Sequence, residues 1–103
     1  MKFQHFGIPA SQEKNWAGYV AELGVHFTDP SVDPFQIEWI KFDLDSPTHK
    51  AVQTKPHVAF QVDDLDAALV GKKILVSPMS PMPGLRIAFI DHDGAIIELS
   101  ETR

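Results

Sequence analysis

The sequence contains no cysteine among its 103 residues. This absence excludes disulfide bonds, thiolate nucleophiles and cysteine-based zinc sites, so any bound metal must be held by nitrogen and oxygen ligands. The sequence also lacks an apolar run approaching the roughly 20 residues of a membrane-spanning helix. Its first residues, Met-Lys-Phe-Gln-His-Phe-Gly, include no apolar stretch of the kind found in signal peptides. We therefore expect a cytoplasmic protein that does not interact with membranes.

Clusters of positive charge are absent as well. The 9 Lys and Arg residues are outnumbered by 14 Asp and Glu, the formal net charge is −5, and no basic cluster is larger than Lys72-Lys73. Because nucleic-acid binding depends on neutralising phosphates, nucleic acid is a poor candidate partner. The composition, 44% hydrophobic and 22% charged, is that of a folded protein. The length fits one domain spanning 1–103.

What the sequence does contain is a repeated pairing of histidine and glutamate. Each half has one His near its start and one Glu near its end: His5 and Glu38, then His57 and Glu98. The two His-to-Glu separations are 33 and 41 residues, as expected for two diverged copies of one unit, the first of which has lost a loop. Two His and two carboxylates gathered in one place would make a site for a divalent metal.

Hydrophobic periodicity predicts a protein of mixed helix and strand. A helix is expected over 12–23, capped by Ser11, because apolar residues recur there at helical spacing. A second short helix is expected after Asp63 or Asp64. Strands are predicted at 2–8, 25–27, 35–42, 57–62, 73–76, 85–91 and 95–100, with loops at 43–55 and 77–84. The order strand, helix, strands occurs twice, which indicates an α+β protein.

Alternation within the predicted strands puts the four candidate ligands on a common face. Successive side chains of a strand point to opposite faces, and in each of the four strands apolar residues point the other way from the candidate ligand. The shared face would also hold Gln36, Ile40, Ala59, Gln61, Ile96 and Ser100, together with Arg86 and Ala88 if strand 85–91 pairs regularly. A concave surface of mixed polar and apolar residues is typical of a small-molecule pocket.

Candidate substrate-binding residues on this face are Arg86, Gln36, Gln61 and Ser100. Arg86 is the one basic residue with a predicted inward direction, and its planar guanidinium would suit a substrate carboxylate or phosphate. The alternative is a structural role, in which Arg86 pairs with Glu98 or Asp91.

Segments of the second half resemble proteins of the glyoxalase/bleomycin-resistance/extradiol-dioxygenase group, the vicinal oxygen chelate superfamily. Pro-His57-Val-Ala-Phe-Gln-Val-Asp-Asp-Leu-Asp-Ala-Ala resembles the opening of that family's module, and Ala88-Phe-Ile-Asp-His-Asp-Gly-Ala-Ile-Ile-Glu98-Leu resembles its closing hairpin. In the first half, His5-Phe-Gly-Ile fits an opening strand and Ile37-Glu38-Trp fits a closing strand. The first half departs from the pattern by being short.

The resemblance implies paired βαβββ modules, with one helix per module, that curl into an open mixed β-barrel around a metal. The modules would span about 1–45 and 56–103 with a linker at 46–55, the first module being shortened. The implied metal ligands are His5, Glu38, His57 and Glu98, and the implied cofactor is a divalent ion such as Zn, Ni, Co, Mn or Fe. A homodimer is also expected, because family members commonly pair modules and a short barrel leaves open sheet edges.

The favoured function is a metal-dependent glyoxalase-type lyase or isomerase acting on a small oxygenated substrate, with Glu98 or Glu38 leaving the metal to act as base. Four ligands suit Lewis-acid and proton-transfer chemistry better than the two-His, one-carboxylate iron site that activates oxygen. The alternative is a non-catalytic protein of the bleomycin-resistance type that binds a drug or metabolite. The four residues could also hydrogen-bond to one another in a metal-free pocket.

Two further expectations concern charge. Without a cation, two glutamates in one pocket would repel each other, so the substitution Glu98→Gln is expected to stabilise the metal-free protein. Metal affinity is expected to fall as the pH drops through the usual imidazole range near ~6.5.

Overall fold

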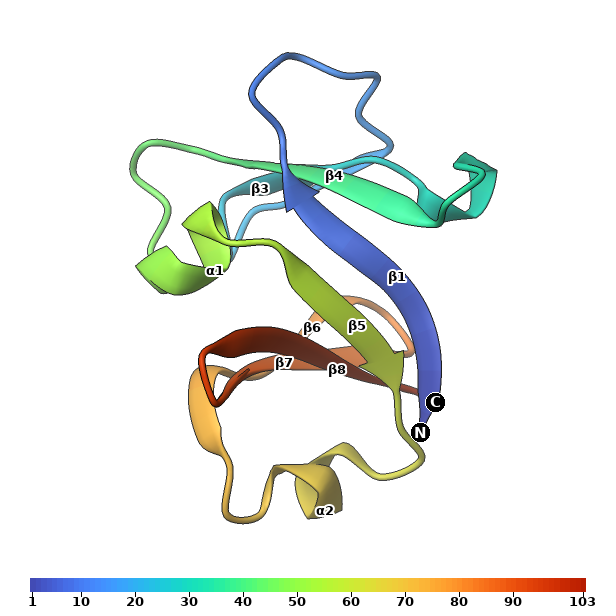
Figure 1. Cartoon of the computed structure of the whole chain (residues 1–103), viewed down its shortest axis with the longest axis vertical. Helices are drawn as coiled ribbons and strands as arrows, with labels where there is room; N and C mark the ends of the chain where they lie inside the picture. The colour runs from blue at the N-terminus through green and yellow to red at the C-terminus, as the bar shows by residue number, and fades with distance from the viewer.

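Strands dominate the computed structural model, which describes residues 1–103 (Figure 1). Eight of them form one curled, mixed sheet. Their bounds are β1 Lys2–Pro9, β2 Gly18–Val20, β3 Val25–Phe27, β4 Ile37–Phe42, β5 His57–Gln61, β6 Lys73–Met82, β7 Leu85–His92 and β8 Ala95–Thr102. The helical segments are a 3-10 turn, η1 Pro30–Val32, and two short helices, α1 Lys50–Thr54 and α2 Leu65–Leu69. The curled mixed sheet fits the predicted barrel, but the protein is mostly β, with two short helices, rather than α+β as predicted.

The strand order of the sheet is β2-β3-β4-β1-β5-β8-β7-β6. β1 and β5 run antiparallel at its centre, and each has a parallel neighbour on its other side, β4 beside β1 and β8 beside β5. From the centre outward, each half of the chain thus contributes its first, fourth, third and second strand. The curl sets β3 and β4 across a cavity from β7 and β8, with β1 and β5 joining the two sides (Figure 1).

The helix predicted over 12–23 is wrong. The segment instead contains β2 and a turn that Gly24 closes at a φ of 60°. Gly18 explains part of the difference, because a Cβ at this position would lie 2.5 Å from Cζ of Phe27 on the paired strand. A glycine and a β-branched valine in mid-segment also weaken a helix. Val20 and Leu23 do face the interior, but from a strand and a turn.

The second predicted helix is confirmed as α2. The Asp64 side chain caps it by accepting a hydrogen bond from the Ala67 N–H. Leu65 and Leu69 are buried against the outer face of β7 and β8. In Figure 1, α2 lies on the outer side of β7 and β8, whereas the irregular chain between β1 and β2 lies on the outer side of β4.

The other helix of the structure, α1, lies inside the segment predicted as a loop at 43–55. His49 caps it, since His49 Nδ1 accepts a hydrogen bond from the Ala51 N–H. Val52 is completely buried and packs against Ile87 and Phe89 on the inner face of β7. α1 therefore fills one end of the space that the sheet encloses. Neither helix has the length or the apolar character needed to cross a membrane.

The last three strands form a continuous meander. β6 extends to Met82 and so includes most of the segment predicted as a loop at 77–84. Its prolines are tolerated because β6 is an edge strand whose pairing with β7 is interrupted by register shifts. The hairpin between β7 and β8 is confirmed. Its turn has positive φ values at Asp93 and Gly94 (51° and 92°), and Asp91 accepts a hydrogen bond from the Gly94 N–H.

Candidate metal centre

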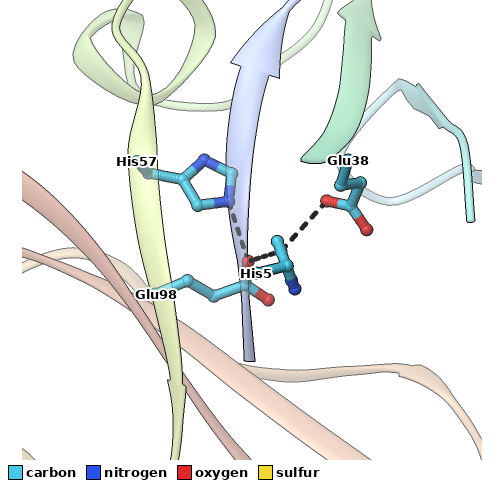
Figure 2. A group of neighbouring side chains, drawn as sticks. All are labelled: His5, Glu38, His57 and Glu98. Carbon is cyan, nitrogen blue, oxygen red and sulfur yellow. Dashed lines mark ion pairs between the residues drawn. The ribbon is translucent and has the colours of Figure 1, made fainter. Parts of the chain in front are cut away.

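Four neighbouring strands each contribute one side chain to a cluster inside the curled sheet. Figure 2 shows His5 from β1, Glu38 from β4, His57 from β5 and Glu98 from β8. These are the four strands at the centre of the sheet. Three of the residues are buried, and Glu38 is partly exposed. The structure thus brings together every residue that the sequence singled out as a metal ligand, on one face as strand alternation predicted.

The cluster occupies two adjacent rows of the sheet, each with a small residue between a His and a Glu. Across the strands, the rows are Glu38, Gly7, His57 and then His5, Ala59, Glu98. In each row, the Glu and the small residue come from one half of the chain and the His comes from the other half, so the two rows are equivalent. A Cβ at position 7 would lie 1.9 Å from Cε1 of His57, so the His57 imidazole lies directly over Gly7.

The candidate ligand atoms approach one another closely. His5 Nε2 lies 3.3 Å from Glu38 Oε1 and 3.5 Å from Glu98 Oε1. His57 Nε2 lies 3.0 Å from the same oxygen of Glu98. One ligand atom from each residue can be chosen so that all lie within 4.8 Å of one another. Because metal bonds to these atoms are about 2.0–2.2 Å long, one ion needs only small side-chain movements to contact all four.

Several nitrogens of the cluster are buried without a hydrogen-bond partner. They are Nε2 of His5 and both ring nitrogens of His57. Carboxylate oxygens lie near the Nε2 atoms of His5 and His57, but no hydrogen bond forms between them. Buried polar atoms are rarely left unpaired, and imidazole nitrogen beside carboxylate oxygen is a donor set that divalent transition metals accept. The residues present therefore fit a divalent metal ion.

The histidines and glutamates of the cluster stabilise one another's charged forms. Burial by itself would lower the pKa of His5, but the adjacent carboxylates of Glu38 and Glu98 outweigh burial and raise this pKa to about 10. Burial would likewise raise the pKa of Glu98, but His5 and His57 lower it to about 2. At neutral pH, a protonated His5 therefore lies between the two carboxylates. The histidines offset the predicted repulsion between the glutamates. We therefore expect Glu98→Gln to destabilise the metal-free protein, the opposite of the expectation from the sequence.

A cavity of about 410 Å³ opens beside the cluster. Gln36 and Ser100 line it, as predicted for substrate contacts. Gln61 does not line it; its Nε2 donates a hydrogen bond to Oγ1 of Thr102 instead. Beyond the four cluster residues, no titratable side chain lines this cavity.

The inward direction predicted for Arg86 is wrong. In the hairpin, Phe89 pairs with Glu98 and Ala88 pairs with Leu99, and directly paired residues share a face. The inner face of β7 therefore carries Phe89, not the neighbouring positions 86 and 88. Arg86 Nη2 lies 3.1 Å from Asp66 on α2, outside the curl, so Arg86 pairs with neither Glu98 nor Asp91. The prediction failed because the register of β7 was off by one residue.

Two features of the site were missed from the sequence. The first is Gly7, for which a signal existed: a small residue follows each candidate histidine at the second position, as Gly7 after His5 and Ala59 after His57. The second is the cavity wall formed by β2 and β3, including Val25 and Phe27. A strand was predicted at 25–27, but its partner β2 was hidden by the incorrect helix over 12–23.

Comparison with known proteins yields the fold alone. No family model matches the chain, and no curated protein matches it. Among solved structures, the chain is similar to the crystal structure of a hypothetical protein from Bacillus halodurans, with a TM-score of 0.66 and 20% sequence identity. The similarity covers 99% of this chain and 94% of the other. The architecture described above is thus found in an experimentally determined protein.

Proposed function

We propose that the protein is a metal-dependent lyase or isomerase of the glyoxalase type acting on a small oxygenated substrate. One observation carries the proposal: two His and two Glu from four central strands converge beside a cavity, and the Nε2 atoms of both histidines are buried there without a hydrogen-bond partner. The matching strand order of the two halves supports the interpretation as paired βαβββ modules. On that interpretation, the first module has lost the helix that α2 provides in the second.

The chain's own residues would divide the work as follows. His5, Glu38, His57 and Glu98 would hold a divalent ion such as Zn, Ni, Co, Mn or Fe, which would supply Lewis-acid polarisation of a substrate oxygen. Gln36 and Ser100 line the cavity and can orient a polar substrate group by hydrogen bonding. The apolar residues of the cavity exclude water from the reacting atoms.

Of the two carboxylates, Glu38 is the better candidate for the general base. The pKa of Glu98 is lowered to about 2 by its two histidine neighbours, which makes its carboxylate a weak proton acceptor. Glu98 lies near both histidines, whereas Glu38 lies near His5 only. Glu38 is also the more exposed of the two, with 18% of its side chain accessible against 10% for Glu98. We therefore assign proton transfer to Glu38 and anchoring of the cluster to Glu98.

Thermal unfolding with added metal, followed by a turnover assay, tests the proposal. At a free metal concentration about 100 times the dissociation constant, binding should add about 2.7 kcal/mol to the free energy of unfolding. This increment corresponds to a rise in melting temperature of roughly 10–20 °C for a domain of this size. The metal-loaded protein should then convert 2-oxoaldehyde–thiol adducts. An unchanged melting temperature with Mn, Co, Ni, Fe and Zn would contradict metal binding.

A non-catalytic binding protein is the second candidate function. The observation that favours it is the absence of any further acid or base on the cavity wall beyond the four cluster residues. Such a protein would bind metal and small molecules saturably but form no product. Metal-loaded protein that binds an adduct without converting it would support this candidate and contradict the enzymatic one. The homodimer expected from the resemblance stays a prediction.

Metal affinity is expected to rise with pH over the neutral range. Because the pKa of His5 is about 10 in the metal-free cluster, metal binding at pH 7 must displace a proton from this imidazole. The apparent affinity should therefore increase about tenfold per pH unit between pH ~6.5 and ~9, rather than level off above ~6.5 as the sequence suggested. Competition with a chelator of known proton affinity measures this slope. A flat profile over the same range would contradict the assignment of His5 as a ligand.

A further inference from the structure

The walls of the cavity are apolar on both sides. Val25, Phe27 and Ile40 line it from the first half of the sheet, and Ile87, Phe89 and Met82 line it from the second half. The polar lining residues are the four cluster residues and a few neutral side chains. A ligand that fills the cavity must therefore bury most of its surface against hydrocarbon and aromatic rings.

No lysine or arginine side chain reaches this cavity. The chain has 9 Lys and Arg residues, and none of them lines the cavity. Arg86, the one cation predicted to point inward, is held on the outside by Asp66 of α2. A second carboxylate, that of Glu101, lies 3.8 Å from the same guanidinium. Arg86 thus has two acidic partners on the far face of β7 and is not free to pair with a ligand.

The cluster cannot supply positive charge either. Two ionised glutamates balance a divalent ion completely, so the loaded site with neutral imidazoles has no net charge. Without metal, the same two glutamates balance both histidines even if each imidazole is protonated. A site with one carboxylate and two histidines would instead keep one positive charge when loaded with a divalent ion, and it would attract anions. Glu38 removes that charge here.

We infer that the cavity accepts uncharged, largely hydrophobic molecules and excludes carboxylates, phosphates and sulfonates. An anion entering it would lose its hydration without gaining net positive charge, because Glu38 and Glu98 already balance the histidines or the metal, and this is strongly unfavourable. That these molecules are substrates rests on the proposed function, whereas their binding does not. The cavity walls are apolar and the cluster has no net positive charge in either form, so uncharged molecules should be preferred with or without metal.

A matched pair of fluorescent probes tests the inference. N-phenyl-1-naphthylamine is uncharged, and 1-anilinonaphthalene-8-sulfonate has the same ring skeleton with one sulfonate added. Both are titrated into the purified chain, once after treatment with chelator and once with Zn added. The uncharged probe should bind at least tenfold more tightly than the sulfonate in both forms. Equal affinities, or tighter binding of the sulfonate, would overturn the inference.

Two variants test whether the probes bind inside the cavity. Met82 is 47% exposed and lines the cavity from an edge strand, so Met82→Lys should fold and add a positive charge at the opening. It should reduce the preference for the uncharged probe by at least fivefold. Val70 is 78% exposed and does not line the cavity, so the matched control Val70→Lys should leave the preference unchanged. The same reduction in both variants would show that the probes bind elsewhere and would contradict the inference.

The substitution Arg86→Gln addresses the rival explanation, in which Arg86 swings inward to bind an anionic substrate. It should leave both probe affinities within twofold of the unsubstituted protein. A selective loss of sulfonate binding would overturn the inference.

The outcome of the probe experiment can be distinguished from failure of the proposed function. If Zn fails to bind while the uncharged probe still binds more tightly, the metal proposal fails alone. If Zn binds and the sulfonate binds more tightly, only the ligand class is wrong.

Discussion

The substitution Glu98→Gln is expected to reduce affinity for Zn, Co or Ni by more than about 100-fold. Removing a group that only orients a ligand typically lowers affinity about 10–100-fold, and Glu98 contacts both histidines of the cluster directly. A neutral amide oxygen is a weaker ligand than a carboxylate and does not balance the charge of the ion. Isothermal titration of the two proteins measures the difference. The matched control is Glu22→Gln at an exposed position, which should bind metal as the unsubstituted chain does.

The same substitution should destabilise the metal-free protein. The pKa of Glu98 is lowered from 4.5 to about 2 in the folded protein, so its ionised form contributes roughly 3 kcal/mol to the free energy of unfolding. Because this folded pKa lies below the unfolded value, the contribution is present above pH ~4.5 and is lost as the pH falls toward ~2. At pH 6, Glu98→Gln should lower the melting temperature by roughly 10–20 °C. A higher melting temperature would support mutual repulsion of the glutamates and contradict the role of His5 between them.

The substitution Gly7→Ala should lower metal affinity by about 10–100-fold, the range seen for residues that orient a ligand. The added Cβ would lie 1.9 Å from Cε1 and 2.2 Å from Nε2 of His57, so the imidazole must leave its present position beside Glu98. Stability should fall by about 1–3 kcal/mol, as in other overpacked sites. This sign is informative because Gly→Ala inside a strand otherwise stabilises by about 0.5–1 kcal/mol. Metal titration and thermal unfolding measure both effects.

The control for this variant is Gly71→Ala. Gly71 has a φ of 74°, and a Cβ there would meet no atom within 4 Å. Backbone strain should therefore destabilise this variant by about 1 kcal/mol, while its metal affinity stays that of the unsubstituted chain. Comparing the two variants separates a general loss of stability from displacement of His57. If Gly7→Ala binds metal as tightly as Gly71→Ala does, the close contact between Gly7 and His57 has no role in the site.

The candidate metal centre could be predicted from the sequence because it depends only on strand alternation and on a repeat. His5, Glu38, His57 and Glu98 each lie on a strand whose neighbours alternate clearly, and no loop conformation intervenes. The period of two then fixes the face of each side chain. Residues from four strands meet because the central strands pair in register, and the barrel that brings these strands together was implied by the family resemblance.

The errors arose where long-range contacts decide the structure. Residues 12–23 have the spacing of an amphipathic helix, but Gly18 packs against Phe27 and the segment pairs as a strand with β3. Arg86 was placed inside because the face of β7 depends on its register with β8, and a shift of one residue reverses every side chain. The helix α1 was missed because it is short and is capped by a histidine, an uncommon cap.

The central claim is that His5, Glu38, His57 and Glu98 together hold one divalent ion. Its most direct test is equilibrium dialysis of the chelator-treated chain against Mn, Fe, Co, Ni and Zn, followed by elemental analysis of the retained metal. The structure predicts close to one ion per chain for at least one of these metals, and almost none after His57→Gln or Glu98→Gln. Retention of no metal by the unsubstituted chain, or of equal metal by all three proteins, would contradict the claim.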